Sequence, residues 1–233
     1  MAQLGKDRLK EGVCYALAHS VHLIEDAVIL YLEDRISSSF HLAIMAREEL
    51  GRATILWKKA DGMTDEETVE AESLAAYLRE HKIKLDAGQS TTHVRLKAEM
   101  VAALTTAIQS NDRVALDKIH RERKRIVSAV RKHDPDRLHK SRLKAQYVDL
   151  NSDGSWSNPS DTKKMDAQTI VLTVAVEIGG TLAELESDRS LSDICAKTNV
   201  SLPSYAAFEA RVTARLLRVS PNIYMAFGCQ GND

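Results

Sequence analysis

The chain has 233 residues, of which 44% are hydrophobic and only 5% aromatic, and 32 basic residues nearly balance 33 acidic ones. This length allows one large domain or two small ones. The low glycine and proline content favours helices over strands. Three cysteines, Cys14, Cys195 and Cys229, lie far apart, so we expect neither a disulfide framework nor a zinc site.

The first twelve residues are charged and contain no apolar signal core. The most apolar run, residues 170–176, is too short to span a membrane. We therefore expect a cytoplasmic protein that does not associate with membranes.

Apolar residues at helical spacing predict an all-α protein without strands. Thr64 and Glu67 resemble a capping box that opens the third helix, and residues 146–161 have the composition of a loop. We expect residues 1–186 to form an antiparallel helical bundle and residues 187–233 a C-terminal helical extension. The helices are predicted over residues 4–32, 40–56, 64–85, 92–108, 112–132, 162–186 and 204–217.

The second predicted helix carries two adjacent acids, Glu48 and Glu49, although it is apolar on almost every side. Such a helix belongs in the middle of a bundle, so we expect both carboxylates to point inward, where they need cationic partners. Only the line through Arg47, Thr54 and Lys58 has the pattern of a solvated face. Glycine inside a helix costs about 1 kcal/mol relative to alanine, so Gly51 indicates close approach of a neighbouring backbone or a ligand.

Candidate partners for the glutamates follow along the chain. His81 shares a helical stripe with Leu74, Leu78 and Leu85, and should face the core beside Lys82 and Lys84. A basic segment containing Arg142, Lys144 and Tyr147 either returns to the bundle and meets the glutamates or forms a solvated run. These residues together fit either a structural ion-pair cluster or a functional site.

Residues 118–144 hold eleven Lys or Arg and three acids, a local net charge of +8. A basic stretch on a mildly acidic protein is the electrostatic footprint expected of nucleic-acid binding. The candidate RNA-binding residues are Arg121, Arg125, Arg131, Lys132, Lys140 and Lys144.

Two patterns typical of metal sites are incomplete, and we expect no metal and no cofactor. His19, His22 and Asp26 share one helical face, but Arg52 occupies the position where a di-iron bundle would have histidine after Glu49. Residues 149–154 match the first half of an EF-hand loop, but Ser160 replaces its bidentate glutamate.

The order of four motifs over residues 5–186 resembles the AbiV group of bacterial phage abortive-infection proteins, in the HEPN superfamily. The first motif is Ala-x-x-Ala-Arg-Glu-Glu-Leu-Gly-Arg at residues 43–52, and the second is His-Lys-x-Lys-Leu at residues 81–85. Tyr-Val-Asp at residues 147–149 and Gly-x-Trp-x-x-Pro at residues 154–159 complete the order.

This resemblance implies a HEPN-like bundle, a homodimer, and an effector of antiphage defence that acts on RNA or the translation machinery. Many HEPN members are metal-independent ribonucleases with an Arg-x4–6-His motif. Here the pairs Arg35–His41 and Arg113–His120 have that spacing without the expected context. The candidate catalytic residues are therefore Glu48, Glu49, His81, Lys84, Arg142 and Tyr147.

Two functions stay open at this point. The first is an antiphage effector that acts on RNA or the translation machinery, with metal-independent ribonuclease activity as one form, and the second is a non-catalytic interaction module that senses or binds a phage protein. RNA or a ribosome-associated component would be the target of the first, and a phage protein could be its activator.

Overall fold

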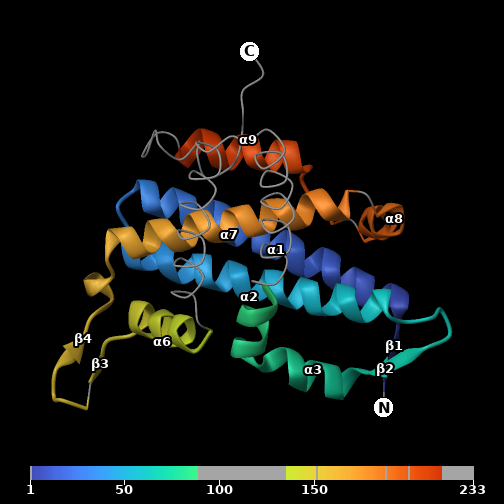
Figure 1. The fold of residues 1–233 in the computed structure, drawn as a ribbon, viewed down its shortest axis with the longest axis horizontal. Coiled ribbons are helices and arrows are strands. Elements are labelled where there is room, and N and C mark those ends of the chain that lie inside the picture. The colour runs from blue at the N-terminus through green and yellow to red at the C-terminus, as the bar shows by residue number, and fades with distance from the viewer. Residues whose placement is uncertain (1, 89–134, 151, 187, 199, 217–233) are drawn as a thin grey trace, which may run out of the picture.

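The computed structural model describes residues 2–88, 135–150, 152–186, 188–198 and 200–216 (Figure 1). Its core is an antiparallel hairpin of two long helices, α1 (Lys6–Leu32) and α2 (Ile36–Asp61), against which α7 (Lys164–Leu185) packs. This arrangement confirms the all-α fold class. The helices predicted over residues 92–108 and 112–132 lie outside the described residues.

Buried serines fix the register of the α1–α2 hairpin. The hydroxyl of Ser20 donates to the carbonyl oxygen of Ala46 at 2.8 Å, and that of Ser39 donates to Ala27 at 2.7 Å. The turn between the helices uses Asp34 in a left-handed conformation, with φ of 60°. Asparagine and aspartate are among the few residues that tolerate this conformation, which explains so short a connection.

Two short strand pairs correct the prediction that the chain has none. Strand β1 (Gln3–Gly5) pairs antiparallel with β2 (Thr68–Glu70), and β3 (Asp149–Leu150) pairs with β4 (Trp156–Ser157). Glu67 does accept a hydrogen bond from the Thr64 N–H at 2.7 Å, but the motif closes a turn instead of opening a helix.

The predicted third helix is therefore divided. Strand β2 replaces its first part, because residues 68–70 pair with β1. Helix α3 (Ala71–Arg79) follows, and Glu80 adopts an extended conformation with ψ of 106°. A separate helical segment then covers residues 81–88.

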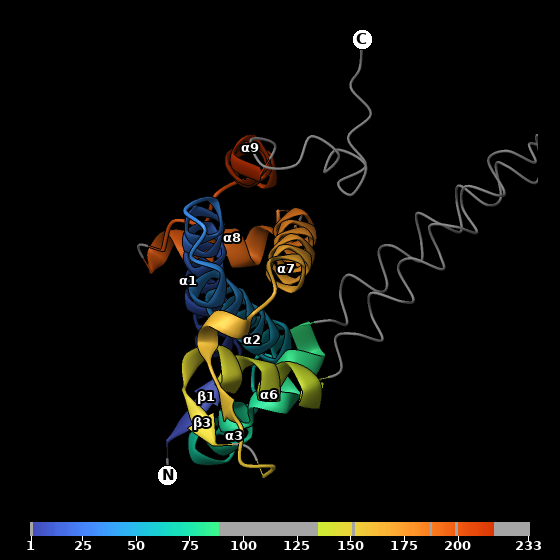
Figure 2. The same ribbon diagram turned by 90° about the vertical axis from the view of Figure 1, so that its left-hand side faces the viewer.

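Three elements were not predicted as such: α6 (Pro135–Gln146), the short 3-10 helix η1 (Pro159–Asp161) and α8 (Arg189–Lys197). Helix α8 and the predicted α9 (Tyr205–Leu216) pack on the bundle, α8 on α1 and α9 on both α1 and α7 (Figure 2). The proposed domain boundary at residue 187 stays a prediction. Apolar side chains of the two helices that lie in the core are Leu191, Ile194, Phe208 and Val212.

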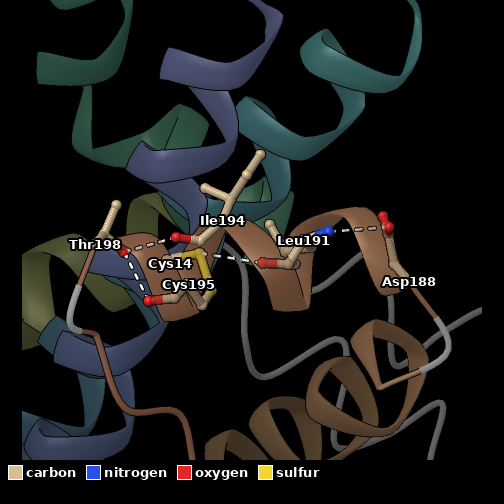
Figure 3. Close-up of a disulfide and its surroundings, with 6 residues drawn as sticks. All are labelled: Cys14, Asp188, Leu191, Ile194, Cys195 and Thr198. Atoms are coloured by element: carbon tan, nitrogen blue, oxygen red, sulfur yellow. Dashed lines mark hydrogen bonds between the residues drawn. A yellow bond between two sulfur atoms is a disulfide. The ribbon is translucent and has the colours of Figure 1, made fainter.

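Helix α8 is joined to α1 by a disulfide between Cys14 and Cys195 (Figure 3). Our expectation that the cysteines form no disulfide was wrong. The two residues are 181 positions apart in the sequence, and only the packing of α8 against α1 brings them together. Asp188 caps α8 by accepting a hydrogen bond from the Leu191 N–H at 3.1 Å.

Reduction of this disulfide is expected to lower the free energy of unfolding by about 2 kcal/mol. A disulfide that closes a long loop restricts the unfolded chain, while the buried Leu191 and Ile194 continue to hold α8 in the reduced protein. Urea denaturation with and without reductant measures the difference, and Cys14→Ser should match the reduced wild type. Equal stability with and without reductant would show that the bridge contributes nothing.

Helices α1 and α7 are each long and apolar enough to cross a membrane by length and composition. This differs from the expectation that no segment is long enough. In the structure the two helices contact each other and α2, and 56% of the apolar window of each is buried.

One face of α2 also differs from expectation. The line predicted to be solvated contains Arg47 and Thr54, which are 2% and 1% exposed. Helix α7 covers this face, and the Arg47 guanidinium donates to the carboxylate of Glu177 on α7. Glu177 lies on a face of α7 that is otherwise mostly apolar, so the sequence did not indicate this ion pair.

Candidate functional site

Two helical segments pack against one side of α2, and each of the three helices supplies two polar side chains to one cluster. Helix α6 and the segment 81–88 lie on the same side of α2, beneath it in Figure 1 and again in Figure 2. We call the six residues the Glu48 cluster: His41 and Glu48 from α2, His81 and Lys84 from segment 81–88, and His139 and Arg142 from α6.

Helical spacing explains why each segment contributes a pair. Residues three apart on a helix lie on one face, as do His81 and Lys84, or His139 and Arg142. Positions seven apart, such as His41 and Glu48, also share a face. Each segment therefore presents two polar groups to the same point.

The Glu48 carboxylate lies at the centre of the cluster and is 4% exposed. Its Oε2 atom is 2.7 Å from Nδ1 of His81 and 3.8 Å from Nζ of Lys84. Its Oε1 atom is 3.5 Å from Nη1 of Arg142. Three basic groups from two other segments thus surround one buried carboxylate, as a buried charge requires.

The cluster reaches solvent at His81. The His81 side chain is 41% exposed, whereas Lys84 and Arg142 are 4% and 12% exposed. The His139 ring stacks on His81, with centroids 5.3 Å apart and planes inclined by 23°. The partly exposed imidazole of His81 therefore contacts a cluster whose carboxylate and cations are largely buried.

Burial lowers the pKa of several members of the cluster. It lowers the pKa of Lys84, which Glu48 partly restores. It also lowers the pKa of His139, and Arg142 and His81 lower it further. The pKa of His41 falls for the same reasons, burial first and Arg142 second. Perturbed titratable groups gathered in one place are typical of functional sites.

Four buried polar atoms of the cluster have no hydrogen-bond partner in the described structure: His41 Nδ1, Glu48 Oε1, His139 Nδ1 and Arg142 Nε. Buried polar atoms in native proteins are nearly always hydrogen-bonded. A group of exceptions around one carboxylate favours a site that takes a polar ligand.

Gly51 and Gly88 hold segment 81–88 against α2. A Cβ added at Gly51 would overlap the backbone carbonyl of Lys84, and one at Gly88 would lie 2.8 Å from the Arg47 oxygen. The close approach that Gly51 indicated is thus that of the Lys84 backbone. Lys82 adds an ion pair with Asp136 on α6, which links the two peripheral segments.

The structure separates Glu49 from Glu48. Glu49 lies 2.8 Å from Nη1 of Arg52 on its own helix and 4.0 Å from Nδ1 of His19 on α1. Tyr147 follows the end of α6 and is 54% exposed, outside the contacts around Glu48. Of the six candidate catalytic residues, four meet: Glu48, His81, Lys84 and Arg142.

Among the candidate RNA-binding residues, Lys140 and Lys144 are exposed on α6. Because they share this helix with Arg142, they lie on the element that also builds the cluster. The other four, Arg121, Arg125, Arg131 and Lys132, lie outside the described residues.

Sequence reasoning missed that His41 and His139 belong to the cluster. A signal existed for each, since His41 occupies the same helical stripe as Glu48 and His139 precedes Arg142 by three positions. Without knowledge that residues 135–146 form a helix, the second spacing had no meaning. The sequence spacing pairs His41 with Arg35, whereas in the structure the arginine that acts on His41 is Arg142 of α6.

No group of three or more metal-ligating side chains gathers within the part of the chain that the structure describes. The acidic loop after β3 forms a turn, in which Asp153 Oδ1 accepts from the Ser155 N–H at 2.9 Å and from its hydroxyl at 2.6 Å. Gly154 in this turn has a positive φ of 80°, which glycine adopts without strain.

The all-α architecture is consistent with the HEPN class of helical proteins. A family model described as AbiV matches residues 8–179, most of the chain. The chain belongs to the AbiV family of HEPN proteins, and thus to the proteins of abortive infection, a defence against phage. Neither the curated proteins nor the solved structures gave a match.

Proposed function

We propose that this protein is a ribonuclease that cleaves RNA at the Glu48 cluster, without a metal ion, during abortive infection. The observation that carries the proposal is the contact between Glu48 and the partly exposed His81, with two cations beside it. The donor set does not favour a metal ion, because Lys84 and Arg142 already neutralise the carboxylate.

The chemistry required for RNA cleavage matches these groups. Attack of a 2′-hydroxyl on the adjacent phosphorus needs proton transfer at the attacking and leaving oxygens, which imidazole performs well near neutral pH. The developing charge on the phosphoryl oxygens needs fixed cations, and Arg142 and Lys84 supply them. Glu48 orients His81 through Nδ1 in the way a carboxylate orients a catalytic histidine.

The basic surface of α6 supports binding of the same substrate. Exposed Lys140 and Lys144 can contact phosphates along the strand while Arg142, on the same helix, reaches the cluster. We propose that Arg121, Arg125, Arg131 and Lys132 also contact RNA.

His81→Ala is expected to reduce cleavage of single-stranded RNA by at least about 100-fold. The variant removes the proton-transferring group while Glu48 keeps Lys84 and Arg142 as partners. The assay follows a labelled RNA in the presence of a chelator, with purified wild-type and variant proteins. His22→Ala is the matched control, because His22 is exposed on α1 and should cleave at the wild-type rate.

The same proteins decide between the open functions. Wild-type protein that binds RNA on a filter but leaves it intact would refute the nuclease and support an RNA-binding protein. Absence of both binding and cleavage would support the second candidate, an interaction module for a phage protein. Exposed apolar side chains near α6 and the start of α7 favour that candidate: Tyr147, Val148, Trp156 and Met165.

We propose a cytoplasmic homodimer as the working form, following the family resemblance. Thiols in a reducing cytoplasm are mostly kept free, and the core residues of α8 would then hold that helix without the bridge. A phage protein is the proposed activator. Light scattering coupled to size-exclusion chromatography tests the dimer.

A further inference from the structure

The Glu48 cluster contains two imidazoles in contact, and they have different surroundings. The rings of His81 and His139 stack with centroids 5.3 Å apart. Two positive rings at this distance repel each other, so the pair favours a state in which only one is charged. Their neighbours decide which one carries the charge.

The contact of His81 with Glu48 suits this ring to the role of proton donor. Its Nδ1 lies 2.7 Å from Glu48 Oε2, and a carboxylate only accepts hydrogen bonds, so Nδ1 carries a hydrogen. The negative charge then stabilises the ring when Nε2 is also protonated. The ring is partly exposed, so solvent can supply that proton.

The surroundings of His139 favour the neutral ring. The His139 ring is partly buried in the cluster, and burial disfavours the charged form of an imidazole. The charged groups that face it are Arg142 on its own helix, His81 and Lys82 on the neighbouring segment, and Glu48 on α2. Burial and the cations lower the pKa of His139 despite the opposing effect of Glu48.

We infer that His139 is the general base and His81 the general acid of the cleavage reaction, an assignment that rests on the proposed ribonuclease function. His139 Nε2 takes the proton of the 2′-hydroxyl as the 2′-oxygen bonds to phosphorus. The bond from phosphorus to the 5′-oxygen breaks, and His81 Nε2 gives its proton to that oxygen. The products are a 2′,3′-cyclic phosphate and a free 5′-hydroxyl, and the two histidines have exchanged protonation states.

A substrate with a better leaving group distinguishes the two roles. Replacing the 5′-oxygen at the mapped cleavage position by sulfur gives a thiolate that departs without a proton, so the general acid becomes dispensable. His81→Ala should then lose at least about 100-fold on ordinary RNA but less than about 10-fold on the sulfur-containing RNA. His139→Ala should lose at least about 100-fold on both.

Other patterns would overturn the assignment in recognisable ways. If His139→Ala cleaves ordinary RNA at the wild-type rate, the assignment fails while the proposed function stands on His81. If His139→Ala, and not His81→Ala, recovers on the sulfur-containing RNA, the two roles are reversed. If the wild type cleaves neither RNA, the proposed function fails and the assignment falls with it.

A measurement on the folded protein keeps the inference testable if the alanine variants unfold. NMR titration of the imidazoles should show that His81→Gln raises the pKa of His139, because a neighbouring positive charge is removed. His22→Gln should leave it unchanged. If His81→Gln leaves the pKa of His139 unaltered, the charge on one ring does not influence the other. That result would overturn the assignment of the two rings as an acid–base pair.

Discussion

Replacing Gly51 with alanine is expected to lower the free energy of unfolding by at least about 3 kcal/mol, the upper end for an overpacked core. The added methyl would overlap the backbone carbonyl of Lys84, and neither α2 nor segment 81–88 can retreat cheaply, because Gly88 packs equally closely against the Arg47 backbone. Urea denaturation measures the change.

The control for this prediction is Gly62→Ala at the C-terminal end of the same helix. Its added Cβ would lie 3.5 Å from the Lys58 oxygen, an ordinary contact, so stability should change by less than about 0.5 kcal/mol. Equal stability of the two variants would contradict the close packing of segment 81–88 on α2. Because that packing positions His81 and Lys84, the Gly51 variant should also lose any RNA cleavage that the wild type shows.

The buried pair of Arg47 and Glu177 is expected to make stability depend on pH. Burial raises the pKa of Glu177 from its ordinary 4.5 to about 7, against the opposing effect of Arg47. Between these values the folded protein holds a proton that the unfolded chain has released, so stability is highest at low pH and falls as the pH rises through 7. From pH 5 to pH 8 this contribution amounts to about 2–3 kcal/mol.

Glu177→Gln removes that titration. The difference in free energy of unfolding between variant and wild type should therefore shift in favour of the variant by about 2–3 kcal/mol as the pH rises from 5 to 8. At pH 5 the amide closely replaces a protonated carboxyl group. Thermal or urea denaturation across this range gives the two curves, and exposed Glu72→Gln should run parallel to wild type. A variant that becomes relatively less stable as pH rises would show that Arg47 stabilises the carboxylate by more than burial costs.

The sequence predicted the parts of this protein that depend on local pattern. Apolar periodicity placed α1, α2 and α7 within a few residues of their observed ends, because each long helix must bury a continuous face. The same reasoning identified Glu48 as an inward acid and Gly51 as a point of close contact. The order of the motifs was enough to indicate the AbiV family, which the family model confirms.

Predictions from local pattern were wrong where contact with a segment distant in the sequence determined the structure. Arg47 looked solvated because its own helix gave no reason to bury it, and α7 buried it by supplying Glu177. Residues 68–70 had a helical context, yet β1 pairs with them. The Cys14–Cys195 bridge has no local signature, since it depends on how α8 docks.

The Glu48 cluster divides along the same line. Residue type and spacing named Glu48, His81, Lys84 and Arg142 in advance, because an inward carboxylate needs cations. Only the tertiary structure separated Glu49 from them, left Tyr147 exposed, and brought in His41 and His139. A sequence fixes which face of a helix is polar, but the distances between faces are set by the packing of three segments far apart in the chain, and proton transfer depends on those distances.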